Sequence, residues 1–211
     1  MKKRILCFGD SNTWGYDTET LERFDEDTRW TYKLSEALGD DYIVIEEGQN
    51  GRTSCFDDPL DPSKNGSHYL VPCLQTHDPL DLMVLMIGTN DLKQRYAATA
   101  KNIAESIQRL VKMAQHTEVW KNEPKILLVA PIIVGKEYEK ALYGENLGAG
   151  CHEKSVLLVK YVKMVAEENE CYYMDANDFV TATPIDWLHI DKKSQLPFAI
   201  GVKAKVMKIL G

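Results

Sequence analysis

The sequence predicts a single α/β domain, residues 1–211, built on a mostly parallel sheet of about five strands. Two observations support this fold class. Short apolar runs alternate along the chain with longer stretches whose apolar residues recur at helical spacing. No repeat, linker or low-complexity tract divides the chain, and its 211 residues suit one domain.

Five short apolar segments have the pattern of strands buried in a parallel sheet. Residues 81–88 (DLMVLMIG) are the clearest, because six apolar residues lie between a carboxylate and a glycine. We expect this segment at the centre of the sheet. The other four segments are residues 4–9 (RILCFG), 42–48 (YIVIEEG), 125–131 (KILLVAP) and 171–176 (CYYMDA).

Four stretches have the pattern of helices that pack one face against the sheet. The clearest covers residues 98–116, where Ile103, Ile107 and Leu110 lie on one apolar stripe. The other three cover residues 30–38, 153–169 and 194–210.

Two segments, residues 52–79 and 132–150, show no clear period. We expect long loops there. Loops of that length in a compact domain usually serve as lids, binding loops or subunit contacts.

Composition and charge exclude several classes of partner. The formal net charge is −7, whereas a nucleic-acid partner requires clustered Lys and Arg. No apolar stretch approaches the roughly 20 residues of a membrane span, and the first apolar run, residues 5–8, is too short for the core of a signal peptide. The five cysteines are odd in number and scattered, so we expect reduced thiols in a cytoplasmic protein.

Four polar motifs follow the predicted strands. They are GDSNT at residues 9–13, GQNGRTS at 48–54, GTND at 88–91 and DWLHID at 186–191. In a parallel α/β sheet, ligands bind beyond the carboxyl ends of the strands. The sequence therefore predicts that these motifs meet in one site.

Ser11 has two interpretations. It suits a helix N-cap, and it also suits a nucleophile, which needs a base, an orienting acid and an oxyanion hole. Among the five histidines, only His189 follows a carboxylate at short range. Its three-residue offset would let Asp186 accept a hydrogen bond from the Nδ1–H of the ring. The alternative is an exposed turn with two unrelated polar residues.

An oxyanion hole needs donors that face the developing negative charge. Asn90 offers a side-chain amide, Gly51 offers an accessible backbone N–H, and the N–H of Ser11 itself would be a third donor. Each of these residues also has an ordinary interpretation in turn or cap chemistry. Their occurrence after successive strands favours the catalytic interpretation.

Together the motifs resemble those of the SGNH-hydrolase superfamily, the GDSL-type lipases, esterases and acylhydrolases. That family is named for a catalytic Ser, Gly, Asn and His in four separated blocks. They correspond here to Ser11, Gly51, Asn90 and His189, with Asp186 in the same block as the histidine. The resemblance implies a three-layer α/β/α, flavodoxin-like SGNH-hydrolase fold and no metal or organic cofactor.

The similarity is closest to the short-chain arylesterase and acyltransferase branch. Two further stretches carry it, RW at residues 29–30 and DDPLDPSKNGSHYL at residues 57–70. One departure is Asn12, which stands where Leu is common and which we expect to change little in the chemistry.

The resemblance implies hydrolysis of small acetyl or aryl esters through an acyl-enzyme on Ser11. His189 would serve as the base and Asp186 would orient it. Alcohols would compete with water for the acyl group, and a carbohydrate O-acetyl esterase is the alternative activity. In this branch the loop near residues 55–79 packs between subunits, so we expect a homo-oligomer.

Four side chains are weaker candidates for substrate contacts: Asp10, Trp14, Arg52 and Trp187. Trp14 would wall an acyl pocket or pack in the core. Arg52 would bind a polar substrate or pair with Asp10 or Asp91, and the ion pair is favoured. Trp187 replaces the glycine usual in the family. Since a positive φ is costly for Trp, we expect an altered turn and a narrower pocket.

Two rival interpretations remain open. One is a metal site formed by His68, Cys73 and His77, although their spacing fits no standard zinc pattern. The other is a non-catalytic flavodoxin-like module that binds phosphate at residues 9–13. The carboxylate of Asp10 is unfavourable for such a phosphate.

Overall fold

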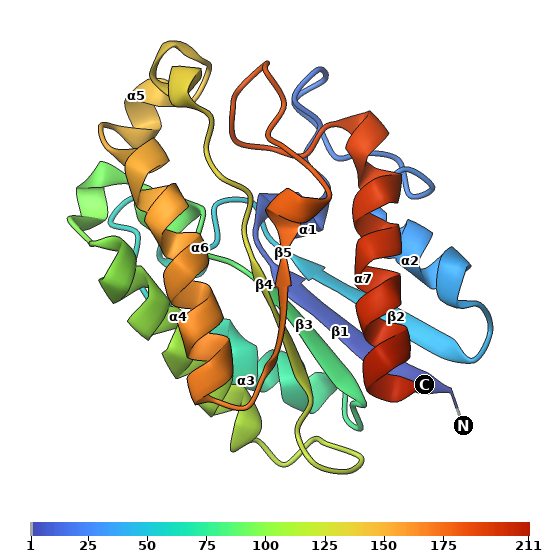
Figure 1. Cartoon of the computed structure of the whole chain (residues 1–211). Coiled ribbons are helices and arrows are strands. Elements are labelled where there is room, and N and C mark those ends of the chain that lie inside the picture. The colour runs from blue at the N-terminus through green and yellow to red at the C-terminus, as the bar shows by residue number, and fades with distance from the viewer. Residues whose placement is uncertain (1) are drawn as a thin grey trace.

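Five parallel strands form one sheet in the computed structural model, which describes residues 2–211. The order β2-β1-β3-β4-β5 places residues 81–88 at the centre, as expected (Figure 1). The strands are β1 (Lys3–Gly9), β2 (Tyr42–Gly48), β3 (Leu82–Met86), β4 (Ile126–Ala130) and β5 (Tyr172–Asp175). Each lies within or beside a segment with the expected apolar pattern.

Helices cover both faces of the sheet (Figure 1). The five long helices are α2 (Trp30–Leu38), α3 (Gly66–Thr76), α4 (Ala100–Gln115), α6 (Cys151–Glu168) and α7 (Gln195–Leu210). α2 and α7 pack on one face of the sheet, and α3, α4 and α6 pack on the other. The α/β fold class with three layers is therefore confirmed.

Strand β1 shows why the strands of this sheet are apolar throughout rather than alternating. Leu6 and Phe8 belong to the apolar cluster under α3, α4 and α6, whereas Ile5 and Cys7 belong to the cluster under α2 and α7. All four side chains are fully buried. A strand covered on both faces has no solvent side on which polar residues would be favoured.

The segment 52–79, expected as a long loop, contains the 11-residue helix α3. Its buried residues Leu70, Cys73 and Leu74 follow helical spacing. The helix also contains Pro72, which removes a backbone donor and obscures the pattern. The expectation of a loop throughout this segment is therefore wrong.

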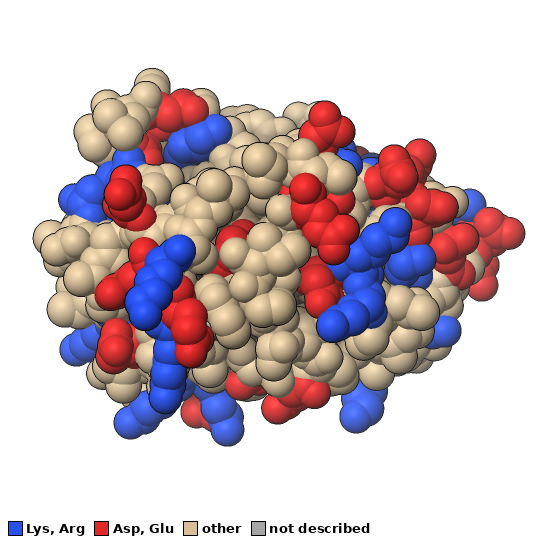
Figure 2. All heavy atoms as spheres, turned by 90° about the horizontal axis from the view of Figure 1, so that it is seen from above, with Lys and Arg blue, Asp and Glu red and all other residues tan. Residues whose placement is uncertain are grey.

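The carboxyl ends of the strands lie toward the top of Figure 1, near the short helices α1 (Ser11–Trp14) and α5 (Gly144–Leu147). Figure 2 views the molecule from that side. Acidic and basic side chains are both present across this face, and no continuous basic surface covers it. Among residues 2–211, no helix combines the length and apolar character that crossing a membrane requires.

Candidate active site

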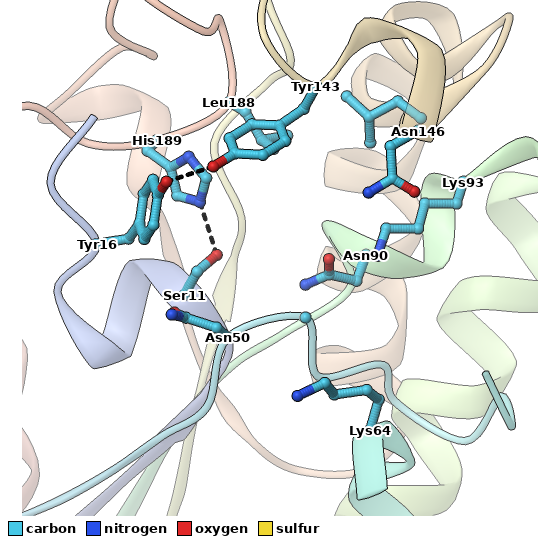
Figure 3. A pocket seen from close by; sticks show the side chains of 12 residues that line it. Ser11, Tyr16, Asn50, Lys64, Asn90, Lys93, Tyr143, Asn146, Leu188 and His189 are labelled. Atoms are coloured by element: carbon cyan, nitrogen blue, oxygen red, sulfur yellow. Dashed lines mark hydrogen bonds between the residues drawn. The ribbon is translucent and has the colours of Figure 1, made fainter. Parts of the chain in front are cut away.

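A cavity of about 330 Å³ lies at the carboxyl edge of the sheet. Four residues expected in the site line it together: Ser11, Gly51, Asn90 and His189 (Figure 3). The first three follow β1, β2 and β3, and His189 precedes α7. The fold thus brings four motifs that are distant in the sequence to one place.

Ser11 is the first residue of α1 and is separated from β1 only by Asp10. The cap of this helix is Asp10, whose carboxylate accepts a hydrogen bond from the N–H of Asn12 at 3.0 Å. The interpretation of Ser11 as the cap is therefore wrong. Its hydroxyl serves elsewhere, since Ser11 Oγ lies 2.8 Å from His189 Nε2. The same Asp10 carboxylate disfavours the phosphate that the rival binding module would hold.

His189 is held between Ser11 and Asp186. Its Nδ1 lies 2.5 Å from Asp186 Oδ2, and Asp186 is fully buried. The second carboxylate oxygen accepts the backbone N–H groups of Leu188 at 2.9 Å and His189 at 3.1 Å. A carboxylate at Nδ1 favours the tautomer that carries its proton there, which leaves Nε2 to accept the Ser11 proton.

Trp187 lies in the turn between Asp186 and His189, but its ring does not narrow the cavity. Its φ is 60°, in the left-handed region that favours glycine. The expectation that tryptophan would avoid a positive φ and alter this turn is therefore wrong. The ring packs on Gly135, where an added Cβ would come within 2.3 Å of it. Leu188, not Trp187, lines the cavity.

Asn90 and Gly51 bring hydrogen-bond donors to the cavity. Asn90 begins a 3-10 turn, Asn90–Leu92, and its side-chain amide donates to the carbonyl of Arg52 at 3.1 Å. That bond orients the amide and leaves its second N–H for a ligand. Gly51 has a φ of 78°, which a glycine adopts without strain. With Ser11, three strand ends supply donors of the kind an oxyanion hole uses.

Arg52 does not line the cavity, and among residues 2–211 it forms no ion pair with Asp10 or Asp91. Its guanidinium donates to the carbonyl of Gly9 at 2.9 Å and lies 4.2 Å from the centre of the Phe8 ring. Both expectations for this side chain are therefore wrong. Arg52 instead ties the end of β1 to the turn after β2.

The carboxyl groups of Asp10 and Asp91 are buried beside these motifs. Asp10 is only 1% exposed and does not line the cavity, so the expected substrate contact is wrong, and burial raises its pKa. Asp91 accepts hydrogen bonds from the N–H of Ser54 at 2.9 Å and from the Ser54 hydroxyl. Burial raises the pKa of Asp91 to about 6 against the lowering effect of those bonds, and the charge of Asp10 adds to the rise.

The aromatic wall expected from Trp14 is formed by Tyr16 and Tyr143. Trp14 does not line the cavity, and its ring lies 5.3 Å from the guanidinium of Arg23. The centre of the Tyr16 ring lies 4.6 Å from that of His189, and the hydroxyls of Tyr16 and Tyr143 are hydrogen-bonded (Figure 3). These two rings cover the histidine.

The other residues that line the cavity were missed by the sequence interpretation. They are Asn50, Lys64, Lys93, Asn146, Leu147 and Leu188. Lys93 follows Asn90 by one 3-10 turn, a spacing that offered a signal. Asn146 and Leu147 belong to the segment 132–150, where a functional loop was expected, but nothing in that segment distinguished them.

The residues of the rival metal site are not assembled as expected. Cys73 and His77 approach Glu47, with one potential ligand atom from each within 4.8 Å of the others. His68 is not part of this group, and its Nε2 lies 3.9 Å from Asp57. His77 Nε2 is already 2.7 Å from a Glu47 oxygen, so a hydrogen bond accounts for the pair.

Residues 7–194 match the GDSL-like lipase/acylhydrolase family. The chain belongs to this family. It is therefore a carboxylic ester hydrolase, and the resemblance inferred from the four motifs is confirmed. No curated protein sequence matches the chain.

Several solved structures are similar over nearly the whole length of both chains. An aryl esterase of M. smegmatis shares 34% identity over 99% of this chain and 100% of its own, with a TM-score of 0.93. A carbohydrate acetylesterase family member from Sinorhizobium meliloti shares 36% identity over 99% of each chain, with a TM-score of 0.92. A lipase/acylhydrolase from Enterococcus faecalis, at 16% identity and a TM-score of 0.69, supports the fold alone.

Proposed function

We propose that this enzyme cleaves small acetyl or aryl esters through an acyl-enzyme formed on Ser11. The observation that carries the proposal is the hydrogen-bonded chain of Ser11, His189 and Asp186. Its two links are 2.8 Å and 2.5 Å long, all three side chains are buried, and Ser11 and His189 line the cavity. A serine, a base and an orienting acid in this order form the constellation used for acyl transfer.

In the first step, Ser11 Oγ attacks the ester carbonyl while His189 Nε2 takes the hydroxyl proton. Asp186 stabilises the imidazolium, and the donors of Ser11, Gly51 and Asn90 stabilise the oxyanion. The imidazolium then gives its proton to the departing alcohol, and the acyl group stays on Ser11. Water repeats the sequence with His189 as base, which releases the acid and restores the serine.

The size and lining of the cavity support a small substrate. A volume of about 330 Å³ lies at the lower end of the range for small-molecule sites. Tyr16, Tyr143, Leu147 and Leu188 supply apolar surface for an acetyl or aryl group. The aryl esterase and the carbohydrate acetylesterase among the similar structures favour the same two classes, so a carbohydrate O-acetyl ester is the alternative substrate.

Alcohols are expected to compete with water for the acyl group. Ser11 and His189 are only 7% and 4% exposed, so bulk water has restricted access to the acyl-enzyme. The measurement is product analysis of an aryl acetate reaction with added alcohol. Formation of the free acid alone, at every alcohol concentration, would contradict this part of the proposal.

The decisive test is hydrolysis of 4-nitrophenyl acetate by the wild-type enzyme and the Ser11→Ala variant. We expect Ser11→Ala to lose at least about 10³-fold in kcat, because the nucleophile, base and acid act as a unit. Ser35→Ala, on α2, is the matched control and should retain wild-type activity. Equal rates for the wild type and Ser11→Ala would refute the assignment, as would a fluorophosphonate adduct on another serine.

We also propose that the enzyme is a homo-oligomer. Two apolar side chains support this, one from each long irregular segment: Leu60 is 80% exposed and Leu142 is 57% exposed. Sedimentation of the wild type and of Leu60→Asp tests it. A monomer at micromolar concentration would contradict the proposal.

A further inference from the structure

Lys93 places an ammonium group in the cavity without a counterion. The residue is only 7% exposed, yet it lines the cavity and extends toward Asn90 (Figure 3). Over residues 2–211, its Nζ takes part in no ion pair or hydrogen bond. Burial of an unpaired ammonium costs free energy, and here burial lowers the pKa of Lys93, with Arg95 adding to the effect.

The charges of three acidic residues act on Lys93, those of Asp58, Asp91 and Asp10, but none of them forms an ion pair with it, and Asp10 accepts a hydrogen bond from the N–H of Asn12 instead. Asp58 lies 3.6 Å from Arg95 and accepts a hydrogen bond from the hydroxyl of Tyr96 at 2.7 Å. Asp91 accepts hydrogen bonds from both the backbone N–H and the hydroxyl of Ser54. The protein therefore supplies no carboxylate in contact with the Lys93 ammonium.

The lining of the cavity has the opposite charge to the whole protein. Two lysines line it, Lys64 and Lys93, and no carboxylate does so in the described part of the chain, although the net charge of the protein is −7. Lys64 extends along Gly51 and is paired with Asp61 at 3.1 Å outside the cavity. Lys93 is thus the unneutralised cation of the site.

We propose that Lys93 makes the cavity selective for esters that carry a carboxylate in addition to the ester group. This inference rests on the proposed esterase function and names its substrate class. A substrate carboxylate would supply the missing counterion and form a charge-assisted hydrogen bond with the ammonium. A neutral ester of the same shape would leave Lys93 unpaired.

The test compares matched anionic and neutral esters, with the carboxylate on either side of the ester bond. On the alcohol side, the pair is 4-acetoxybenzoate and its methyl ester. On the acyl side, the pair is the 4-nitrophenyl monoester of glutaric acid and its methyl ester. The ester pair in which the enzyme prefers the anionic member shows whether Lys93 binds the alcohol part or the acyl part of the substrate.

We expect Lys93→Met to lower kcat/KM for the anionic member of one pair by about 10- to 100-fold, the range for a hydrogen bond to a charged group. The neutral member should change less than about threefold. Lys93→Arg should retain the preference, and Lys208→Met, exposed at the end of α7, should leave both rates unchanged. Activity on the neutral esters also shows that each variant is folded.

Two outcomes would overturn the proposal. An unchanged anionic-to-neutral ratio in Lys93→Met would show that the ammonium binds no carboxylate. An equal loss on both members would assign Lys93 to the ester group itself. Neither outcome affects the esterase proposal, which fails separately if Ser11→Ala retains activity on the neutral esters.

Discussion

The two walls of the cavity differ in how far their polar groups are bonded within the protein. On one wall, Ser11, His189 and Asp186 form a closed chain in which each group has a partner. On the other wall, the ammonium of Lys93 has no partner among residues 2–211, and the buried side-chain oxygen of Asn50 in the same cavity has none either (Figure 3). The first wall is prepared for chemistry, and the second is left open for the substrate.

The difference follows from what each wall has to do. A nucleophile and its base must be held in one geometry before substrate arrives, and bonds within the protein achieve that. Groups that recognise substrate must have unused bonding capacity, and the buried ones are stabilised when the ligand supplies their partner. Variants that disrupt the first wall should therefore lower kcat more than variants in the second.

The largest effect on kcat is expected from Asp186→Asn on the first wall. An amide retains an acceptor for the N–H groups of Leu188 and His189, but it does not hold the Nδ1 proton as a carboxylate does. We expect kcat for 4-nitrophenyl acetate to fall by about 10⁴-fold with a folded protein. Asp40→Asn, at an exposed site, is the control. A loss smaller than tenfold would show that the orienting acid lies elsewhere.

The second-largest loss of kcat is expected from Asn90→Ala on the opposite wall. Removing one oxyanion donor should lower kcat by about 10²–10³-fold and leave KM nearly unchanged, because the donor acts on the transition state. Asn122→Ala, in an exposed loop, is the matched control. A rise in KM with an unchanged kcat would instead make Asn90 a residue of ordinary substrate binding.

The groups that perform the chemistry, on both walls, were predictable from the sequence, and the other lining residues largely were not. Ser11, Gly51 and Asn90 each follow a strand, and parallel strands end at one edge of the sheet. Asp186 and His189 lie three residues apart in a single turn. Short-range spacing and strand ends therefore contained most of the information about the chemical groups.

The aromatic residues that cover His189 depend on contacts between distant segments. Tyr16 and Tyr143 meet across 127 residues of sequence, and no local pattern marks that pair. Trp14 was the plausible aromatic wall, but α1 ends at once in Gly15, whose φ is 88°, so the chain turns and Tyr16 faces His189 instead. The role of Arg52 was predicted wrongly because it binds the backbone carbonyls of Gly9 and Glu47, which have no signature in the sequence.

Asp91, the neighbour of Asn90 in the chain, is fully buried and bonded to Ser54 outside the cavity lining, so its effect should be visible in stability rather than in rate. Its folded-state pKa of about 6 lies above the ordinary value of 3.8, so the folded protein binds the proton more tightly than the unfolded one. Stability from this group is present below pH 4 and is lost as the pH rises toward 6. The loss should be about 3 kcal/mol, from the size of the shift.

The measurement is the free energy of unfolding in denaturant at pH 4 and pH 7 for the wild type and Asp91→Asn. As the pH rises, the free energy of unfolding of the wild type should fall relative to that of Asp91→Asn. Ser54→Ala removes a hydrogen bond that lowers this pKa, so it should enlarge the pH dependence. If the free energies of unfolding of the wild type and Asp91→Asn differed by the same amount at both pH values, the raised pKa of Asp91 would be contradicted.

The smallest effect on rate is expected at Asn12, which supports the first wall. Its side-chain oxygen accepts the N–H of Ile190 at 2.9 Å, and its amide donates to the carbonyl of Leu188 at 3.3 Å. These bonds hold both neighbours of His189 against the helix that carries Ser11. Asn12 was expected to change little in the chemistry. It makes no bond to the reacting atoms, but we expect its bonds to fix the positions of these atoms.

Asn12→Leu keeps the volume of this buried residue and removes both bonds. We expect a loss of stability of about 1–3 kcal/mol, because a buried N–H and a carbonyl lose their partners. We also expect kcat to fall about tenfold, since small displacements of a base are costly in rate. The rate is measured well below the melting temperature, so that every molecule is folded. Lower stability with an unchanged kcat would mean that Asn12 holds the fold but does not set the distance from His189 to Ser11.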